Sequence, residues 1–307
     1  MQQRTISGIT RFLVVGGDGF LGSALSQTIQ SHGGNVTATS RRCAASSESS
    51  VFLDLYDEES LAKLDVSGFE TAFICAGVSK YSEFDATPLV CQHALVENTI
   101  LFCSRLMDAG CFIVYLSTSA VFSGEQPYVA ENSDTSPTTA YGRHKCKVEQ
   151  GLLELTAGSA GVVAIVRISK VLAPNTPIIC DWYDSLSSGE NIYPLSDLRI
   201  SPVSLSYVVE GLIELACARE QGVFHLSGER DITYADLASG LADQWGFPSD
   251  RVRPVTSKTA GVLPSYTPRH PSLGMTRAAQ AVGKRPQSLE NCIAEVAKGL
   301  EGIGKRT

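Results

Sequence analysis

Tyr141 and Lys145 stand four residues apart in the segment Tyr-Gly-Arg-His-Lys. On a helix this spacing places both side chains on one face, one turn apart. A phenol with a pKa near ~10 is a poor proton donor or acceptor at neutral pH. A lysine cation within ~6 Å stabilises the phenolate and lowers that pKa, which suits the phenol to proton transfer. The spacing is also common by chance on helix surfaces.

Three hydroxyl side chains end the apolar run that begins at Tyr115, and they precede Tyr141 by about 23 positions. They are Ser117, Thr118 and Ser119. The carboxyl end of a parallel strand is where open α/β sheets bind ligands, so each could donate to a substrate carbonyl that gains negative charge. The alternative is that these hydroxyls only form a turn or cap a helix.

Glycines 16, 19 and 22 follow the first apolar run and open a helical pattern. A tight turn, close backbone approach and close helix packing are what a pyrophosphate at a helix N-terminus requires. Strand-to-helix turns often contain glycine for other reasons, but the strand before and the helix after favour a dinucleotide.

The second predicted strand ends with Thr39-Ser40-Arg41-Arg42. An NAD site usually has an acidic residue here for the ribose 2′-hydroxyl, whereas arginine accommodates a 2′-phosphate. The segment therefore favours NADP(H) over NAD(H). The alternative is that Arg41 and Arg42 are a solvated pair in a loop.

Short apolar runs alternate with helical patterns through the first two-thirds of the chain. Strands are expected over residues 11–15, 35–39, 51–53, 71–75, 111–116, 162–168 and 223–226. Helices are expected from about residue 20 and over about 90–109, 141–155 and 203–219. This alternation predicts a doubly wound parallel α/β sheet, a Rossmann fold.

The alternation stops after Lys170, where prolines become frequent and residues 181–198 show little regular period. We therefore predict two parts. Residues 1–169 with about 201–228 form the dinucleotide-binding Rossmann domain. Residues from about 170–200 with 229–307 form a smaller, mostly C-terminal lobe that binds the substrate.

The 307 residues carry a formal net charge of −7 and include nine cysteines. An acidic chain has no electrostatic footprint for nucleic acid. No apolar run approaches the ~20 residues of a membrane helix, and residues 1–10 lack the apolar core of a signal peptide. The cysteines form no Cys-x-x-Cys pair, so we expect a reduced, cytoplasmic protein without a metal site.

The combination resembles the extended short-chain dehydrogenase/reductases over about residues 11–228, and is most similar to the dTDP-4-dehydrorhamnose reductase-like group of sugar-nucleotide enzymes. The motifs that carry the resemblance are the glycine loop, Ser117-Thr118-x-x-Val121-Phe122-x-Gly124, Tyr141-Gly142-Arg143-x-Lys145 with Glu149, and residues 222–228. Many members of the family dimerise through the two long helices beside the sheet, so the resemblance allows a homodimer.

The resemblance implies a role for each matched residue. Tyr141 would be the general acid, Lys145 would bind the nicotinamide ribose and lower the pKa of Tyr141, and Thr118 would hydrogen-bond the reacting oxygen. The expected cofactor contacts are Gly16, Gly19, Phe20, Leu21, Gly22, Ser40, Arg41, Arg42, Asp54, Leu55, Cys75, Ala76, Gly77, Ser117, Tyr141 and Lys145. The candidate substrate contacts are Ser79, Lys80, Ser119 and Arg199. His144, a third of a turn off the face of Tyr141, is expected to be exposed.

Ser119-Ala120 follows the candidate catalytic hydroxyl. The family's 4,6-dehydratases have an Asp-Glu pair there, and its decarboxylases keep the Glu, so neither chemistry has its acid or base in this chain. The remaining expectation is reduction of a keto group with NADP(H), the 4-keto group of a nucleotide-linked sugar. Two alternatives stay open: a C4 epimerase, and a non-catalytic, nucleotide-binding regulatory subunit of the same fold.

Overall fold

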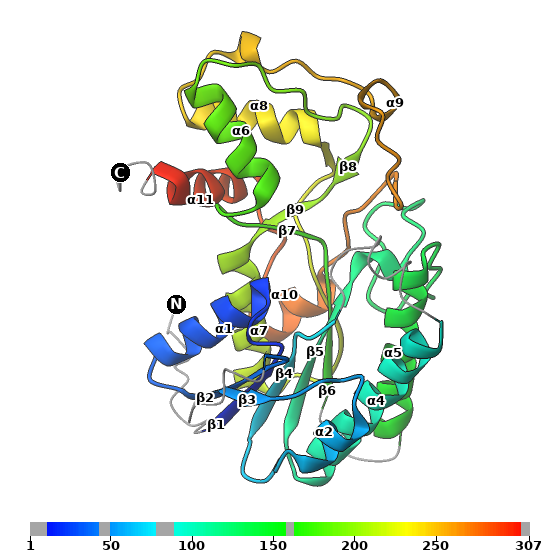
Figure 1. Ribbon diagram of the computed structural model, residues 1–307. Helices are drawn as coiled ribbons and strands as arrows, with labels where there is room; N and C mark the ends of the chain where they lie inside the picture. The colour runs from blue at the N-terminus through cyan, green and yellow to red at the C-terminus, as the bar shows by residue number, and fades with distance from the viewer. Residues whose placement is uncertain (1–10, 43–49, 78–88, 158–162, 302–307) are drawn as a thin grey trace.

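The computed structural model describes residues 11–42, 50–77, 89–157 and 163–301 (Figure 1). Its centre is a sheet of seven parallel strands in the spatial order β10-β6-β5-β4-β1-β2-β3, which confirms the predicted doubly wound α/β fold. The strands are β1 (Arg11–Val15), β2 (Asn35–Ser40), β3 (Ser50–Phe52), β4 (Thr71–Ile74), β5 (Phe112–Thr118), β6 (Val163–Ile168) and β10 (Gly222–Leu226).

Alternate residues of β1 face opposite layers of helices. Phe12 and Val14 pack in the same core as α1 (Phe20–Ser31), α7 (Leu205–Ala218) and α10 (Thr276–Val282). Leu13 and Val15 pack with α2 (Glu58–Lys63), α4 (Leu89–Asp108) and α5 (Ala140–Thr156). Figure 1 shows the two layers on opposite sides of the sheet. Burial of both faces explains why the strands read as continuous apolar runs.

The strand order reverses between β1 and β4. From β1 the chain moves outward to β2 and β3, and then returns to place β4 on the other side of β1. The register pairs Val15 with Ile74 and Ile74 with Tyr115, so the carboxyl ends of the three strands lie at one edge of the sheet. Such a switch point is where open α/β sheets bind ligands.

A third core lies above the sheet in Figure 1. Its elements are α6 (Pro177–Ser187), β8 (Arg199–Ile200), β11 (Ile232–Thr233), α8 (Tyr234–Gln244) and α11 (Leu289–Glu301), and Val252, which follows η3 (Ser249–Arg251), packs with them. The expectation of little regular structure over 181–198 is wrong for its first part, because Pro177 begins a helix whose Ile179, Trp182 and Leu186 form one buried stripe. The division into two lobes at residues 169, 200 and 228 stays a prediction.

Shorter elements connect these layers. They are β7 (Lys170–Leu172) paired with β9 (Pro202–Ser204), the turn η2 (Ser119–Val121) and α9 (Ser257–Ala260). Among the described residues, no helix has both the length and the apolar character to cross a bilayer.

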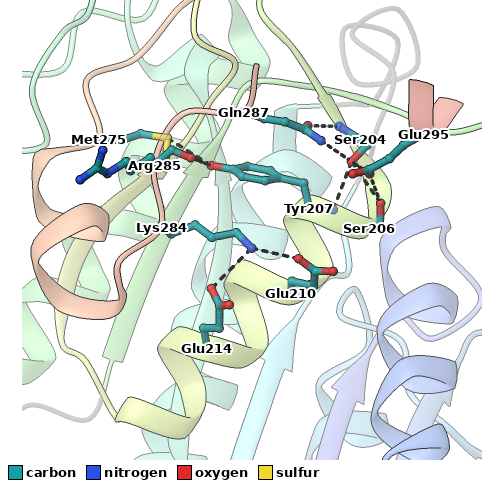
Figure 2. Close-up of polar contacts among 10 residues, drawn as sticks. All are labelled: Ser204, Ser206, Tyr207, Glu210, Glu214, Met275, Lys284, Arg285, Gln287 and Glu295. Atoms are coloured by element: carbon teal, nitrogen blue, oxygen red, sulfur yellow. Dashed lines mark hydrogen bonds and ion pairs between the residues drawn. The ribbon is translucent and has the colours of Figure 1, made fainter. Parts of the chain in front are cut away.

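The chain after α10 is held against the start of α7 by a polar network (Figure 2). The Tyr207 hydroxyl donates to the Arg285 carbonyl over 2.7 Å, and the Ser204 amide donates to Gln287 Oε1 over 2.7 Å. Lys284 Nζ lies 3.1 Å from a Glu210 carboxylate oxygen.

Glu295 on α11 accepts hydrogen bonds from the hydroxyls of Ser204 and Ser206. These contacts hold α11, part of the third core, against the start of α7, which packs on the sheet.

Candidate active site

The loop between β1 and α1 forms a close turn. Gly16 has a φ of +87°, which glycine adopts without strain, and a Cβ on Gly22 would lie 2.2 Å from the Gly16 carbonyl oxygen. Gly19 precedes α1 with no side-chain cap, and no acidic residue occupies the first turn. The helix therefore presents unsatisfied N–H groups and the positive end of its dipole, a combination that suits a phosphate.

A cavity of about 590 Å³ lies over this loop, at the switch point. Ten of the predicted cofactor contacts line it: Gly16, Gly19, Ser40, Arg41, Arg42, Asp54, Leu55, Cys75, Ala76 and Gly77. Gly22 does not line the cavity, but its lack of a side chain allows the main chain at Gly16 to pack against the start of α1. The buried Asn98 donates to the Leu55 carbonyl over 2.9 Å, which holds one wall in place. The residues present fit a dinucleotide with its pyrophosphate on the loop.

A second cavity, of about 730 Å³, adjoins the first, and both are lined by Cys75 and Gly77. Its lining includes Phe20, Leu21, Ser117, Thr118, Ser119, Tyr141, Lys145 and Arg199. The structure thus brings the three candidate catalytic residues to one wall, although they come from β5 and α5. Ser79 and Lys80 lie outside the described residues.

Lys145 is buried and fixed. Its Nζ donates to the Leu116 carbonyl over 2.8 Å and lies 4.6 Å from the centre of the Tyr115 ring. Burial lowers the pKa of Lys145 to about 8, against the opposing effect of the Glu149 and Cys75 charges. Burial raises the pKa of Tyr141 to about 12, so the expectation that Lys145 lowers this pKa is wrong. At neutral pH the phenol therefore holds its proton while most of the lysine is charged.

The two hydroxyls that end β5, Ser117 and Thr118, differ in their surroundings. Ser117 donates to the buried carboxylate of Glu149, which forms a two-pronged ion pair with Arg167, with Nη2 to Oε2 at 2.7 Å. Thr118 accepts a hydrogen bond from the Ala120 amide at 3.2 Å and begins η2 as its cap, so its own hydroxyl proton can point elsewhere. Thr118 therefore lines the cavity and keeps a hydroxyl proton that it can donate to a ligand.

The expectation that His144 is exposed is wrong, since its exposed fraction is 8%. The sheet and neighbouring segments cover more of α5 than one face, and burial extends from Gly142 to Lys145 on either side of Arg143. His144 does not line either cavity.

Several lining residues had no sequence motif to reveal them. They are Lys170, Tyr234, Ser169 and the segment 263–266 of the second cavity, and Tyr56 of the first. Ser169 is buried, and its hydroxyl has no hydrogen-bond partner among the described residues. Leu263 is 97% exposed at the edge of the cavity. For Ser169 and Lys170 the topology gives a reason, because they follow β6, the strand next to β5 in the sheet.

Comparison with known proteins agrees with the geometry. The model of the RmlD substrate binding domain family matches residues 10–301. Methionine adenosyltransferase 2 subunit beta of Xenopus laevis is 24% identical over 90% of this chain and 84% of its own length. A dTDP-4-keto-6-deoxy-D-glucose reductase of Streptomyces niveus is 28% identical over 84% of this chain and 87% of its own.

A solved dTDP-glucose 4,6-dehydratase of Streptomyces venezuelae, which contains NAD, has a TM-score of 0.76 and 20% identity, with 95% of this chain and 97% of that chain covered. This likeness establishes the fold. The family match covers almost the whole described chain, and it confirms the resemblance to the dTDP-4-dehydrorhamnose reductase-like group. The chain belongs to the RmlD substrate binding domain family.

Proposed function

We propose that the protein is an NADP(H)-dependent oxidoreductase that reduces the 4-keto group of a nucleotide-linked deoxysugar. The observation that carries the proposal is the meeting of two cavities at Cys75 and Gly77, one over the glycine loop and one lined by Thr118, Tyr141 and Lys145. Hydride transfer needs a cofactor and a carbonyl in contact, with a proton donor beside the carbonyl oxygen.

Tyr141 is the general acid in this account. Its phenol keeps its proton at neutral pH because burial raises its pKa to about 12. The proton passes from the Tyr141 hydroxyl to the carbonyl oxygen as that oxygen becomes an alcohol. The charged Lys145, one helical turn away, stabilises the phenolate left behind, and the Leu116 carbonyl keeps that ammonium in place.

Thr118 donates a hydrogen bond to the same substrate oxygen and stabilises its developing charge. The glycine loop and the N-terminus of α1 would hold the pyrophosphate of a bound dinucleotide, and Lys145 would also hold its nicotinamide ribose. A reduced nicotinamide dinucleotide supplies the hydride when bound. Arg41 and Arg42 line the first cavity just after the end of β2, and they support the preference for NADP(H).

The charge of the second cavity supports an anionic substrate. Its described lining contains Lys145, Lys170 and Arg199 but no aspartate or glutamate, in a chain whose net charge is −7. A diphosphate-linked sugar would be attracted to such a surface. The relative from Streptomyces niveus, a dTDP-4-keto-6-deoxy-D-glucose reductase by name, supports the same class of substrate.

The test is cofactor absorbance with a panel of 4-keto-6-deoxy sugar nucleotides, with NADPH and NADH run in parallel. We expect stoichiometric oxidation of NADPH with at least one member of the panel. Interconversion of C4 epimers without net oxidation would instead establish the epimerase.

A second candidate function has its own support. The relative from Xenopus laevis is named as a subunit of methionine adenosyltransferase, so this chain could serve another enzyme without turning over a sugar. Binding of NADPH without turnover of any keto sugar, together with co-purification of a catalytic partner, would favour that role over the reductase.

A further inference from the structure

An acidic side chain reaches the end of β2 from an unexpected place. Ser40, the last residue of β2, donates its hydroxyl proton to Asp18 Oδ2, from the glycine loop. The same hydroxyl accepts a hydrogen bond from the Arg42 amide at 3.0 Å. Ser40 is 3% exposed, so the Asp18 carboxylate is held by a rigid, buried anchor.

The end of the second strand is where a dinucleotide site reads the adenosine ribose. A carboxylate there accepts from the 2′-hydroxyl of NAD(H), and an arginine accommodates the 2′-phosphate of NADP(H). The end of β2 lacks a carboxylate of its own, but Asp18, Ser40, Arg41 and Arg42 line one cavity. The carboxylate comes from the neighbouring loop, 22 residues earlier in the chain.

Asp18 forms no ion pair with either arginine. Among the described residues, neither guanidinium has a hydrogen bond or ion pair, and Asp18 accepts only from Ser40. A 2′-phosphate bound by the arginines would therefore lie in a cavity that also contains a carboxylate without an ion pair to any described residue. A like charge close to a bound anion weakens its binding.

We infer that Asp18 is a specificity-determining residue for the cofactor. Its carboxylate accepts a hydrogen bond from the 2′-hydroxyl of NAD(H) and repels the 2′-phosphate of NADP(H), and so it limits the preference that Arg41 and Arg42 create. The inference rests on the proposed function only in taking the ligand to be a nicotinamide dinucleotide. It extends that function to a protein that binds both NADPH and NADH.

The test compares Asp18→Asn with the wild-type protein by direct titration of NADPH and NADH. The amide keeps the size of the side chain and an oxygen acceptor for Ser40, but removes the charge. We expect the ratio of the NADH to the NADPH dissociation constant to rise by about 10-fold or more. The shorter probes 2′,5′-ADP and 5′-AMP, which lack the nicotinamide half, should show the same shift, because the effect arises at the ribose.

Asp108→Asn is the matched control, since it makes the same charge change at an exposed residue at the end of α4. Its ratio should equal that of the wild type. An unchanged ratio in Asp18→Asn, or a fall in its affinity for NADPH relative to NADH, would overturn the inference.

Binding rather than turnover is the readout, so the two proposals fail separately. A shift in the ratio without turnover of any keto sugar would support the role of Asp18 while contradicting the reductase. Turnover with an unshifted ratio would do the reverse. If neither dinucleotide bound the wild type, both proposals would be contradicted.

Discussion

Lys145 on α5 donates to the main-chain carbonyl of Leu116 on β5 over 2.8 Å. The bond joins a helix to the strand whose end carries Ser117 and Thr118. A Cβ on Gly77 would lie 3.7 Å from the Lys145 Nζ, so the ammonium also faces the strand end shared by both cavities. The buried ammonium of Lys145 is therefore fixed between the cavity lined by Tyr141 and the cavity over the glycine loop.

This placement predicts a pH limit on activity. Burial lowers the pKa of Lys145 to about 8, whereas an unfolded chain would titrate it near 10.5. The charged form predominates below pH 8 in the folded protein, so turnover should fall as the pH rises through about 8. Steady-state rates at saturating cofactor and substrate, from pH 6 to pH 10, measure it. A rate that is flat to pH 10 would show that the charge of Lys145 is not needed.

The lowered pKa of Lys145 also affects stability, which should rise with pH where the activity falls. Between about pH 8 and 10.5, the unfolded chain binds a proton at Lys145 that the folded protein does not. Unfolding there takes up a proton, so the contribution of Lys145 to the free energy of unfolding rises with pH across this window. Denaturant melts of wild type and Lys145→Met should therefore diverge in favour of the wild type as the pH rises. A difference that is constant with pH would contradict the shift.

Glu149 and Arg167 form a buried ion pair, with exposed fractions of 3% and 5% for their side chains. Glu149→Gln leaves the arginine without a counter-charge, so we expect the free energy of unfolding to fall by about 3–5 kcal/mol. Glu59→Gln is the control, because Glu59 pairs with Lys63 on an exposed turn of α2, at 75% and 72% exposure. That change should cost less than about 1 kcal/mol. Urea denaturation of both variants measures the difference, and equal losses would contradict the buried role.

Gly22 tests the loop. Its Cβ position lies 2.2 Å from the Gly16 carbonyl oxygen, a main-chain atom that cannot move without opening the turn. Gly22→Ala should weaken dinucleotide binding by about 10-fold or more, because the loop N–H groups would no longer converge on the pyrophosphate. Ser23→Ala, the next residue of α1, adds no atom and should bind normally. Titration with NADPH distinguishes them, and equal affinity would mean that the loop does not hold the dinucleotide.

The sheet could be predicted from the sequence because its information is local. Each buried strand is a continuous apolar run, and the strand that the sequence predicts over residues 11–15 matches β1, Arg11–Val15. Helix α6 was missed because prolines on both sides obscured its stripe of Ile179, Trp182 and Leu186. The pairing of β7 with β9 joins residues about 30 positions apart, and no local pattern indicates such a pair.

The candidate site divides in the same way. Tyr141, Lys145 and Thr118 belong to motifs with fixed spacing, so they could be named in advance. Asp18 lies inside the glycine motif, but its relation to Ser40 depends on how β2 lies beside the loop. Lys170 and Tyr234 reach the second cavity from segments with no motif, and only the fold brings them there.

Tyr141 donates the proton during carbonyl reduction in the proposed mechanism, and Tyr141→Phe tests this role most directly. The change removes one hydroxyl, so NADPH affinity should match the wild type within about 2-fold, while the rate of NADPH oxidation at saturating keto sugar should fall by about 10²–10⁴-fold. The measurement is the absorbance of NADPH for both proteins, with cofactor affinity determined separately. Turnover by Tyr141→Phe at the wild-type rate would contradict the account.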